Sequence, residues 1–160
     1  MPAVDFQTIE GGCTCGGVRY RLTTSPLFVH CCHCSWCQRE SGSAFVINAL
    51  IEADCVELLS GEVEIIDTPS ESRKGQKIHR CTKCKIAVWS NYAGSGDAIH
   101  FLRVGTLDHP DNVPPDVHIF TSSKQSWVTL PAGTPAVPEF YRWADYWPAE
   151  SIDRYKAARS

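Results

Sequence analysis

Hydrophobic and polar positions alternate along several short segments that are rich in β-branched and aromatic residues. This pattern favours strands with one face buried and one face in water. No segment carries a long apolar repeat at the period of a helix. We therefore expect strands at 18–22, 44–47, 63–66, 86–89, 99–104 and 117–120. The fold class predicted is all-β, with packed antiparallel sheets and few short helices.

Turn residues separate these segments, as at Ser25-Pro26, Ser60-Gly61 and the proline-rich stretch 109–116. The chain has 160 residues, a length that suits one domain with its own core. Hydrophobic residues make up 43% and charged residues 21%, which is too apolar for a disordered chain. We expect a single domain over residues 1–160.

The last thirty residues, 131–160, differ from the rest of the chain. Four prolines are expected to break any regular element there, at positions 131, 135, 138 and 148. Aromatic residues are dense in the same tail: Phe140, Tyr141, Trp143, Tyr146 and Trp147. We expect them to pack on the sheet surface. A substrate lid or a dimer contact is the alternative.

The charge pattern argues against nucleic acid as a partner. The net charge is −3, the pI is near 6.0, and the basic residues are scattered. The longest apolar run, near 43–51, falls short of the roughly 18 residues that a membrane helix needs. The N-terminal residues carry no export signal, so we expect a cytoplasmic protein that binds no membrane.

Nine cysteines are the strongest chemical signal in the chain. Reduced thiols at paired spacings indicate metal binding, with zinc as the first candidate. Cys13 and Cys15 share one face of an extended segment, and the spacing of Cys81 and Cys84 is that of a zinc knuckle. Together these four thiols can complete a tetrahedral site.

A second group contains three cysteines within six residues, Cys32, Cys34 and Cys37. A zinc ion with three protein ligands keeps a position for water or a substrate thiol, whereas four thiolates form a closed structural site. Spacing alone leaves the pairing open, since Cys81 and Cys84 could also close the second group. Two inert zinc sites, or one ion shared by five thiols, are the other readings.

The two remaining cysteines and the histidines are expected to be structural. Cys31 points away from Cys32 on an extended segment, and Cys55 has no ligand at a suitable spacing. His33 should also point away from its neighbours, in a supporting or surface role. Single histidines are predicted to be hydrogen-bonded rather than metal ligands: His30, His79, His100, His109 and His118.

The order of these motifs resembles the glutathione-dependent formaldehyde-activating enzyme (GFA) family, which includes centromere protein V. The resemblance rests on 13-CTCGGVRY-20, on 32-CHCSWC-37 leading into 42-GSAF-45, and on 81-CTKC-84. It implies a β-tent fold in which Cys13, Cys15, Cys81 and Cys84 hold a structural zinc. It also implies that Cys32, Cys34 and Cys37 hold a catalytic zinc, which could be exchangeable.

The family's activity joins glutathione to formaldehyde, giving S-hydroxymethylglutathione, and is classed as a carbon–sulfur lyase in reverse. We expect this reaction, or the addition of a similar thiol to a small aldehyde. A homo-oligomer is compatible with the sequence. Gln38 stands where many relatives have a basic residue, so Arg39 is the predicted glutathione contact, with Lys85 and Arg103 as further candidates. For each of these three residues, a solvated surface charge is the alternative role. A non-catalytic zinc module that binds a protein partner is the alternative, and a nucleic-acid zinc ribbon ranks last.

Overall fold

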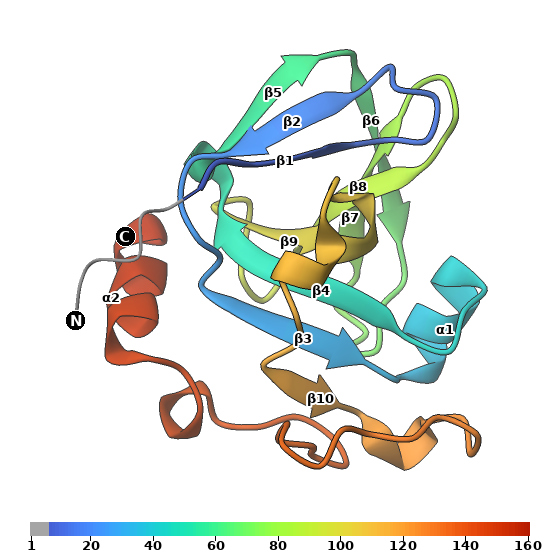
Figure 1. The fold of residues 1–160 in the computed structure, drawn as a ribbon, viewed down its shortest axis with the longest axis vertical. Coiled ribbons are helices and arrows are strands. Elements are labelled where there is room, and N and C mark those ends of the chain that lie inside the picture. The colour runs from blue at the N-terminus through green and yellow to red at the C-terminus, as the bar shows by residue number, and fades with distance from the viewer. Residues whose placement is uncertain (1–6) are drawn as a thin grey trace.

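Two β-sheets make up most of the protein in the computed structural model, which describes residues 7–160 (Figure 1). The smaller sheet has the order β1-β2-β5, with β1 at Ile9–Gly12, β2 at Arg19–Leu22 and β5 at Val56–Ser60. The larger sheet has the order β10-β3-β4-β9-β8-β7-β6. Its strands are β3 (Phe28–Cys32), β4 (Val46–Glu52), β6 (Val63–Thr68), β7 (Gln76–Cys81), β8 (Ala87–Tyr92), β9 (Ile99–Arg103) and β10 (Val117–Ile119).

Helices are few, and neighbouring strands are antiparallel except for the parallel pair β10 and β3. The α-helices of the described residues are α1 (Ser35–Ser41) and α2 (Ala149–Ala158). Short 3₁₀ turns lie at Ala53–Cys55, Val104–Thr106, Pro110–Asn112, Thr121–Ser123 and Trp143–Asp145. The expected all-β fold class is confirmed. Neither α-helix of residues 7–160 has the length and hydropathy needed to cross a bilayer.

The central strands of the large sheet bury side chains on both faces, since alternate side chains point in opposite directions. In β4, Ala49 and Ile51 join a core under the small sheet, whereas Val46 and Leu50 join a second core on the other face. In the first core, Tyr20 of β2 is fully buried. Residues of the C-terminal tail complete the second core. The small sheet and the tail therefore cover opposite faces of the large sheet (Figure 1).

Each of the six predicted strand segments overlaps an observed strand, namely β2, β4, β6, β8, β9 and β10. Four strands were not predicted: β1, β3, β5 and β7. All five residues of β3 are buried, so its sequence shows no alternation. Polar residues dominate β7, from Gln76 to Cys81, although its alternate positions 76 and 78 are buried. Pattern alone does not separate such segments from loops.

The prediction that prolines exclude regular structure from the tail is wrong for α2. Pro148 lies just before the first helical residue, where its missing N–H removes no intrahelical hydrogen bond. The predicted packing of tail aromatics on the sheet is confirmed for Trp147, which is buried and stacks on Phe28 of β3. Phe140, in contrast, keeps 58% of its surface exposed.

Candidate functional site

The first cysteine group joins two loops that are far apart in the sequence. Cys13 and Cys15 follow β1, whereas Cys81 ends β7 and Cys84 lies in the turn before β8. The four sulfur atoms lie within 4.8 Å of one another. Cys13 Sγ is 3.5 Å from Cys15 Sγ, which is 3.8 Å from Cys81 Sγ. A zinc tetrahedron with Zn–S bonds of about 2.3 Å has edges of about 3.8 Å, so these thiols fit zinc.

Backbone amides support the sulfurs of this closed group. The Val18 N–H donates to Cys13 Sγ at 3.2 Å, and the Lys83 N–H donates to Cys81 Sγ at 3.4 Å. The N–H groups of Ile86 and Cys15 lower the pKa of the Cys84 thiol to about 6. These donors favour thiolates, the form that binds metal.

A glycine allows the first cysteine loop to approach the turn between β5 and β6. Gly61 has φ +84°, and a Cβ there would lie 2.2 Å from the carbonyl oxygen of Gly17. Any larger residue would push the loop carrying Cys15 away from the sheet. The closed group thus depends on backbone packing as well as on its thiols.

The second group is local in sequence. Cys32 ends β3, Cys34 is the N-cap of α1, and Cys37 lies in the first turn of that helix. Their sulfurs lie within 4.8 Å of one another, and all three residues are buried. In residues 7–160 this group contains no fourth cysteine, histidine or acidic ligand. Three thiols therefore converge on one point from a strand end and a helix start.

Within this group, Cys34 is the thiol whose pKa is lowered, chiefly by its two neighbouring thiols. Contacts from the Cys32 and Cys37 thiols lower the pKa of Cys34 to about 3, and the N–H groups of Cys37 and Trp36 add to that effect. The Cys37 N–H lies 3.3 Å from Cys34 Sγ. A soft, thiolate-only donor set of this kind suits zinc.

A cavity of about 460 Å³ opens onto the three-cysteine group and is lined by Cys32, Cys34 and Cys37. Its volume is within the usual range for small-molecule sites. The other walls come from β4, β8, β9, the β6–β7 loop and the C-terminal tail. None of the four cysteines of the closed group lines this cavity. The second group is thus the one in contact with a space for substrate.

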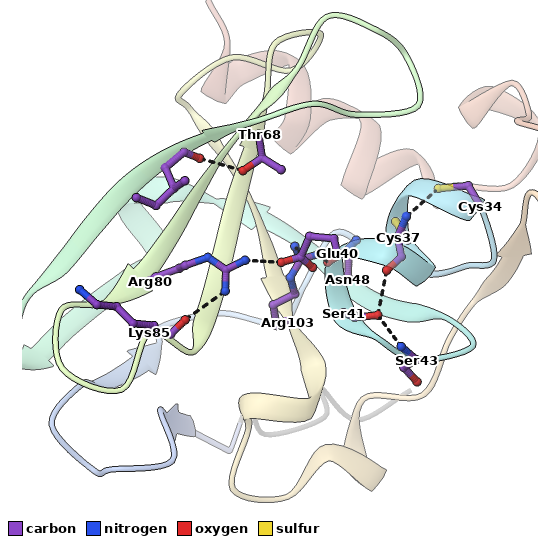
Figure 2. A network of polar contacts seen from close by, with 11 residues as sticks. Cys34, Cys37, Glu40, Ser41, Ser43, Asn48, Thr68, Arg80, Lys85 and Arg103 are labelled. Atoms are coloured by element: carbon purple, nitrogen blue, oxygen red, sulfur yellow. Dashed lines mark hydrogen bonds and ion pairs between the residues drawn. The ribbon is translucent and has the colours of Figure 1, made fainter.

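Glu40 ties the helix of the second group to the large sheet (Figure 2). Its carboxylate accepts hydrogen bonds from Arg80 of β7 and, at 3.3 Å, from Arg103 of β9. Arg103 also donates to Asn48 Oδ1 at 2.8 Å. Since Arg80 directly precedes Cys81, the same ion pair links α1 to the strand that leads into the closed group.

The predicted anion contacts lie outside the cavity wall. Arg39 is exposed in the last turn of α1, and neither Lys85 nor Arg103 lines the cavity. Lys85 pairs with Glu64 at 2.7 Å. Arg103 is buried and paired, not solvated as its charge suggests. The role of Arg39 stays a prediction.

A third group, which the sequence did not predict, brings together Cys31, His33 and His118. His33 Nε2 lies 3.0 Å from His118 Nδ1 and 3.5 Å from Cys31 Sγ. His33 is fully buried, so the surface role considered for it is wrong. Burial lowers the pKa of His33 to about 4 and raises that of Cys31 to about 12, which favours a neutral, hydrogen-bonded chain. The parallel pairing of β10 with β3 creates this contact, and no local spacing signals it.

Comparisons with known proteins identify one family whose model matches most of the chain. A family model described as "Glutathione-dependent formaldehyde-activating enzyme" matches residues 8–123. A Halomonas elongata protein named "Putative glutathione-dependent formaldehyde-activating enzyme" is 27% identical over 133 residues, covering 76% of this chain and 80% of that protein. A crystal structure of a Rhodobacter sphaeroides protein is 20% identical and covers 66% of this chain and 96% of its own, with a TM-score of 0.49.

Proposed function

The chain belongs to the glutathione-dependent formaldehyde-activating enzyme family, and from that premise we propose that it joins the thiol of glutathione to a small aldehyde at a zinc held by Cys32, Cys34 and Cys37. With formaldehyde the product is S-hydroxymethylglutathione, and the reverse reaction is that of a carbon–sulfur lyase. The observation that carries the proposal is that these three thiols, with no fourth ligand in residues 7–160, line a cavity. Cys13, Cys15, Cys81 and Cys84 hold a structural zinc in this proposal.

Zinc bound at the three thiols would lower the pKa of an incoming substrate thiol and so raise the fraction present as the nucleophilic thiolate. Cys32, Cys34 and Cys37 supply negative charge and fix the position at which the substrate sulfur arrives. All three residues are buried apart from the side that faces the cavity. The addition forms one C–S bond, breaks the carbonyl π bond, and transfers the thiol proton to the carbonyl oxygen.

Asn48 is our candidate for binding the carbonyl oxygen. It lines the cavity, and its Oδ1 accepts from Arg103, which can only donate. The amide nitrogen is thereby left as the hydrogen-bond donor of Asn48. A fixed donor beside the thiol group would stabilise the oxygen as negative charge develops on it. Arg39, exposed on the same helix as Cys37, remains the predicted contact for a glutathione carboxylate at the cavity mouth.

The test begins with zinc counted per chain by elemental analysis, before and after glutathione is added. Two zincs, or one firmly held and one that exchanges with glutathione, are expected. Cys34→Ala should lose the second zinc and reduce S-hydroxymethylglutathione formation at least about 100-fold, as expected when a catalytic metal is lost. Cys55→Ala is the matched control, because Cys55 lies in neither thiol group.

Full activity and metal content in Cys34→Ala would falsify the proposed mechanism. One zinc that glutathione leaves unchanged would instead support the alternative, a non-catalytic zinc module for a protein partner. A cytoplasmic setting, where thiols stay reduced, belongs to this proposal and agrees with nine unpaired cysteines in the structure.

A further inference from the structure

The cavity beside the three-cysteine group is much more aromatic than formaldehyde or glutathione requires. Five of its lining residues come from the C-terminal tail: Phe140, Tyr141, Trp143, Trp147 and Tyr155. Tyr92 of β8 and Phe101 of β9 also line it and lie 4.5 Å apart between ring centroids. Aromatic side chains at this density bind flat apolar groups by stacking and edge contacts.

Charged groups are scarce in the same cavity. Its charged lining residues, apart from the thiols, are Glu71 and Lys74 in the β6–β7 loop. Glutathione carries two carboxylates and one ammonium group, and these lose hydration when buried without partners. Glutathione therefore fits with its charged ends at the mouth and only its cysteinyl arm inside. The aromatic part of the cavity is then free to hold the second substrate, the aldehyde.

The aromatic wall is held in place before any ligand binds. The Trp147 indole N–H donates to Tyr141 Oη at 2.7 Å, and Tyr141 Oη lies 2.5 Å from His30 Nε2 on β3. The Tyr155 hydroxyl lies 2.9 Å from Ser95 Oγ. Close by, Arg154 of α2 forms a two-pronged ion pair with Glu52 of β4. Because these hydrogen bonds already fix the aromatic side chains, ligand binding costs little of their conformational entropy.

The rim of the cavity also presents apolar surface to water. Phe140 is 58% exposed, Trp36 of α1 is 41% exposed and Trp143 is 36% exposed. Large aromatic side chains that are exposed together at the mouth of a pocket are typical of a binding surface. The family match ends at residue 123, so the tail that supplies most of these rings lies outside it.

We propose that the aldehyde used by this protein carries an aromatic body, which fills the space between the C-terminal tail and the sheet while its carbonyl carbon faces the three-cysteine group. This inference rests on the proposed thiol addition and narrows its electrophile to aromatic aldehydes. The reaction is the same addition as with formaldehyde: the thiol sulfur bonds to the carbonyl carbon, and the thiol proton goes to the carbonyl oxygen.

Binding is measured first, on the zinc-loaded protein, with benzyl alcohol as an unreactive probe. Quenching of tryptophan fluorescence or titration calorimetry should show one saturable site per chain. The double variant Phe140→Ser with Trp143→Ser should weaken binding about 10-fold, because it removes two rings from the cavity wall. Trp127→Ser is the matched control, since Trp127 is 71% exposed and does not line the cavity.

The rate of glutathione addition is then compared for benzaldehyde and formaldehyde. We expect a preference for benzaldehyde in kcat/KM that the double variant lowers about 10-fold and Trp127→Ser leaves unchanged. Formaldehyde addition without a benzaldehyde reaction or a benzyl alcohol site would overturn this inference and leave the proposed function standing. A preference seen only with an aromatic thiol such as benzyl mercaptan would also overturn it. Benzyl alcohol binding with no addition to any aldehyde would overturn the proposed function itself.

Discussion

The two cysteine groups have the same ligand type but very different surroundings. The closed group draws its four thiols from the loop after β1 and from the end of β7 with the turn that follows, and it does not line the aromatic cavity. The three-cysteine group takes its thiols from one strand end and one helix start. The first therefore holds distant segments together. The second leaves room beside its thiols for another molecule. Ligand count and the origin of the ligands along the chain, more than cysteine chemistry itself, distinguish the two groups.

The largest effect is expected from breaking the closed group. Cys81→Ser removes a buried thiol from the group of four, and structural zinc contributes on the order of 10 kcal/mol to folding. This contribution is comparable to the whole folding stability of a typical domain, about 5–15 kcal/mol, so we expect an unfolded or aggregating protein. Circular dichroism and the zinc content of the soluble fraction would show the change. Cys55→Ser should fold normally, and a Cys81→Ser protein with an unchanged urea midpoint would contradict the structural role.

A smaller effect is expected from cutting the link between the groups. Glu40→Gln removes the carboxylate that faces Arg80 and Arg103, whose side chains are 26% and 9% exposed. Because a buried arginine loses its counter-ion, we expect a loss of about 2–3 kcal/mol in the free energy of unfolding, measured in urea. Zinc should also leave the open group faster, because α1 is less firmly held. Glu64→Gln breaks only the exposed pair with Lys85 and should change stability by less than about 0.5 kcal/mol.

The smallest effect is a pH dependence on the closed-group face of the sheet. Burial lowers the pKa of His100 to about 4, with a contribution from His79, and its ring stacks on Trp89 at 5.1 Å. In the unfolded chain the pKa of His100 is near 6.5, so the unfolded state binds a proton more readily than the folded state does. The free energy of unfolding is therefore unaffected by His100 above about pH 6.5 and falls as the pH drops toward 4. We expect about 1–2 kcal/mol to be lost by pH 5.

The variant His100→Phe keeps a ring against Trp89 and removes the titration. The side-chain amide of Asn91 lies 3.0 Å from His100 Nδ1 and would lose that partner, but it keeps its hydrogen bond to the Ile99 carbonyl at 2.7 Å. The difference between the urea unfolding curves of the two proteins, taken from pH 7 to pH 5, isolates His100 from any acid effect on the thiols. Parallel losses of stability in both proteins would show that His100 contributes nothing to this pH dependence.

Sequence could predict the parts of the molecule that local patterns determine. The cysteine pairs follow from spacing, and strands such as β9 follow from alternation. β3 and the contact of His33 with His118 do not, because they depend on burial from both sides and on a parallel neighbour 85 residues away. The cavity escaped prediction for the same reason: no local pattern shows that Asn48, Phe101 and Trp147 face one space. The tail helix was missed because Pro148 looked like a breaker instead of a start.

The separation of the ligands along the chain also bears on how the protein is made. Cys32, Cys34 and Cys37 can meet as soon as a short segment has left the ribosome, but Cys15 waits for Cys81, 66 residues later. The three-cysteine group can thus form earlier during synthesis than the four-cysteine group, which joins segments far apart in the sequence. The aromatic wall is completed last, when α2 docks on β4 through Arg154 and Glu52. Cys13 and Cys15 therefore stay without their partners for longest on a nascent chain, which makes these two the thiols most open to oxidation before the sheets come together.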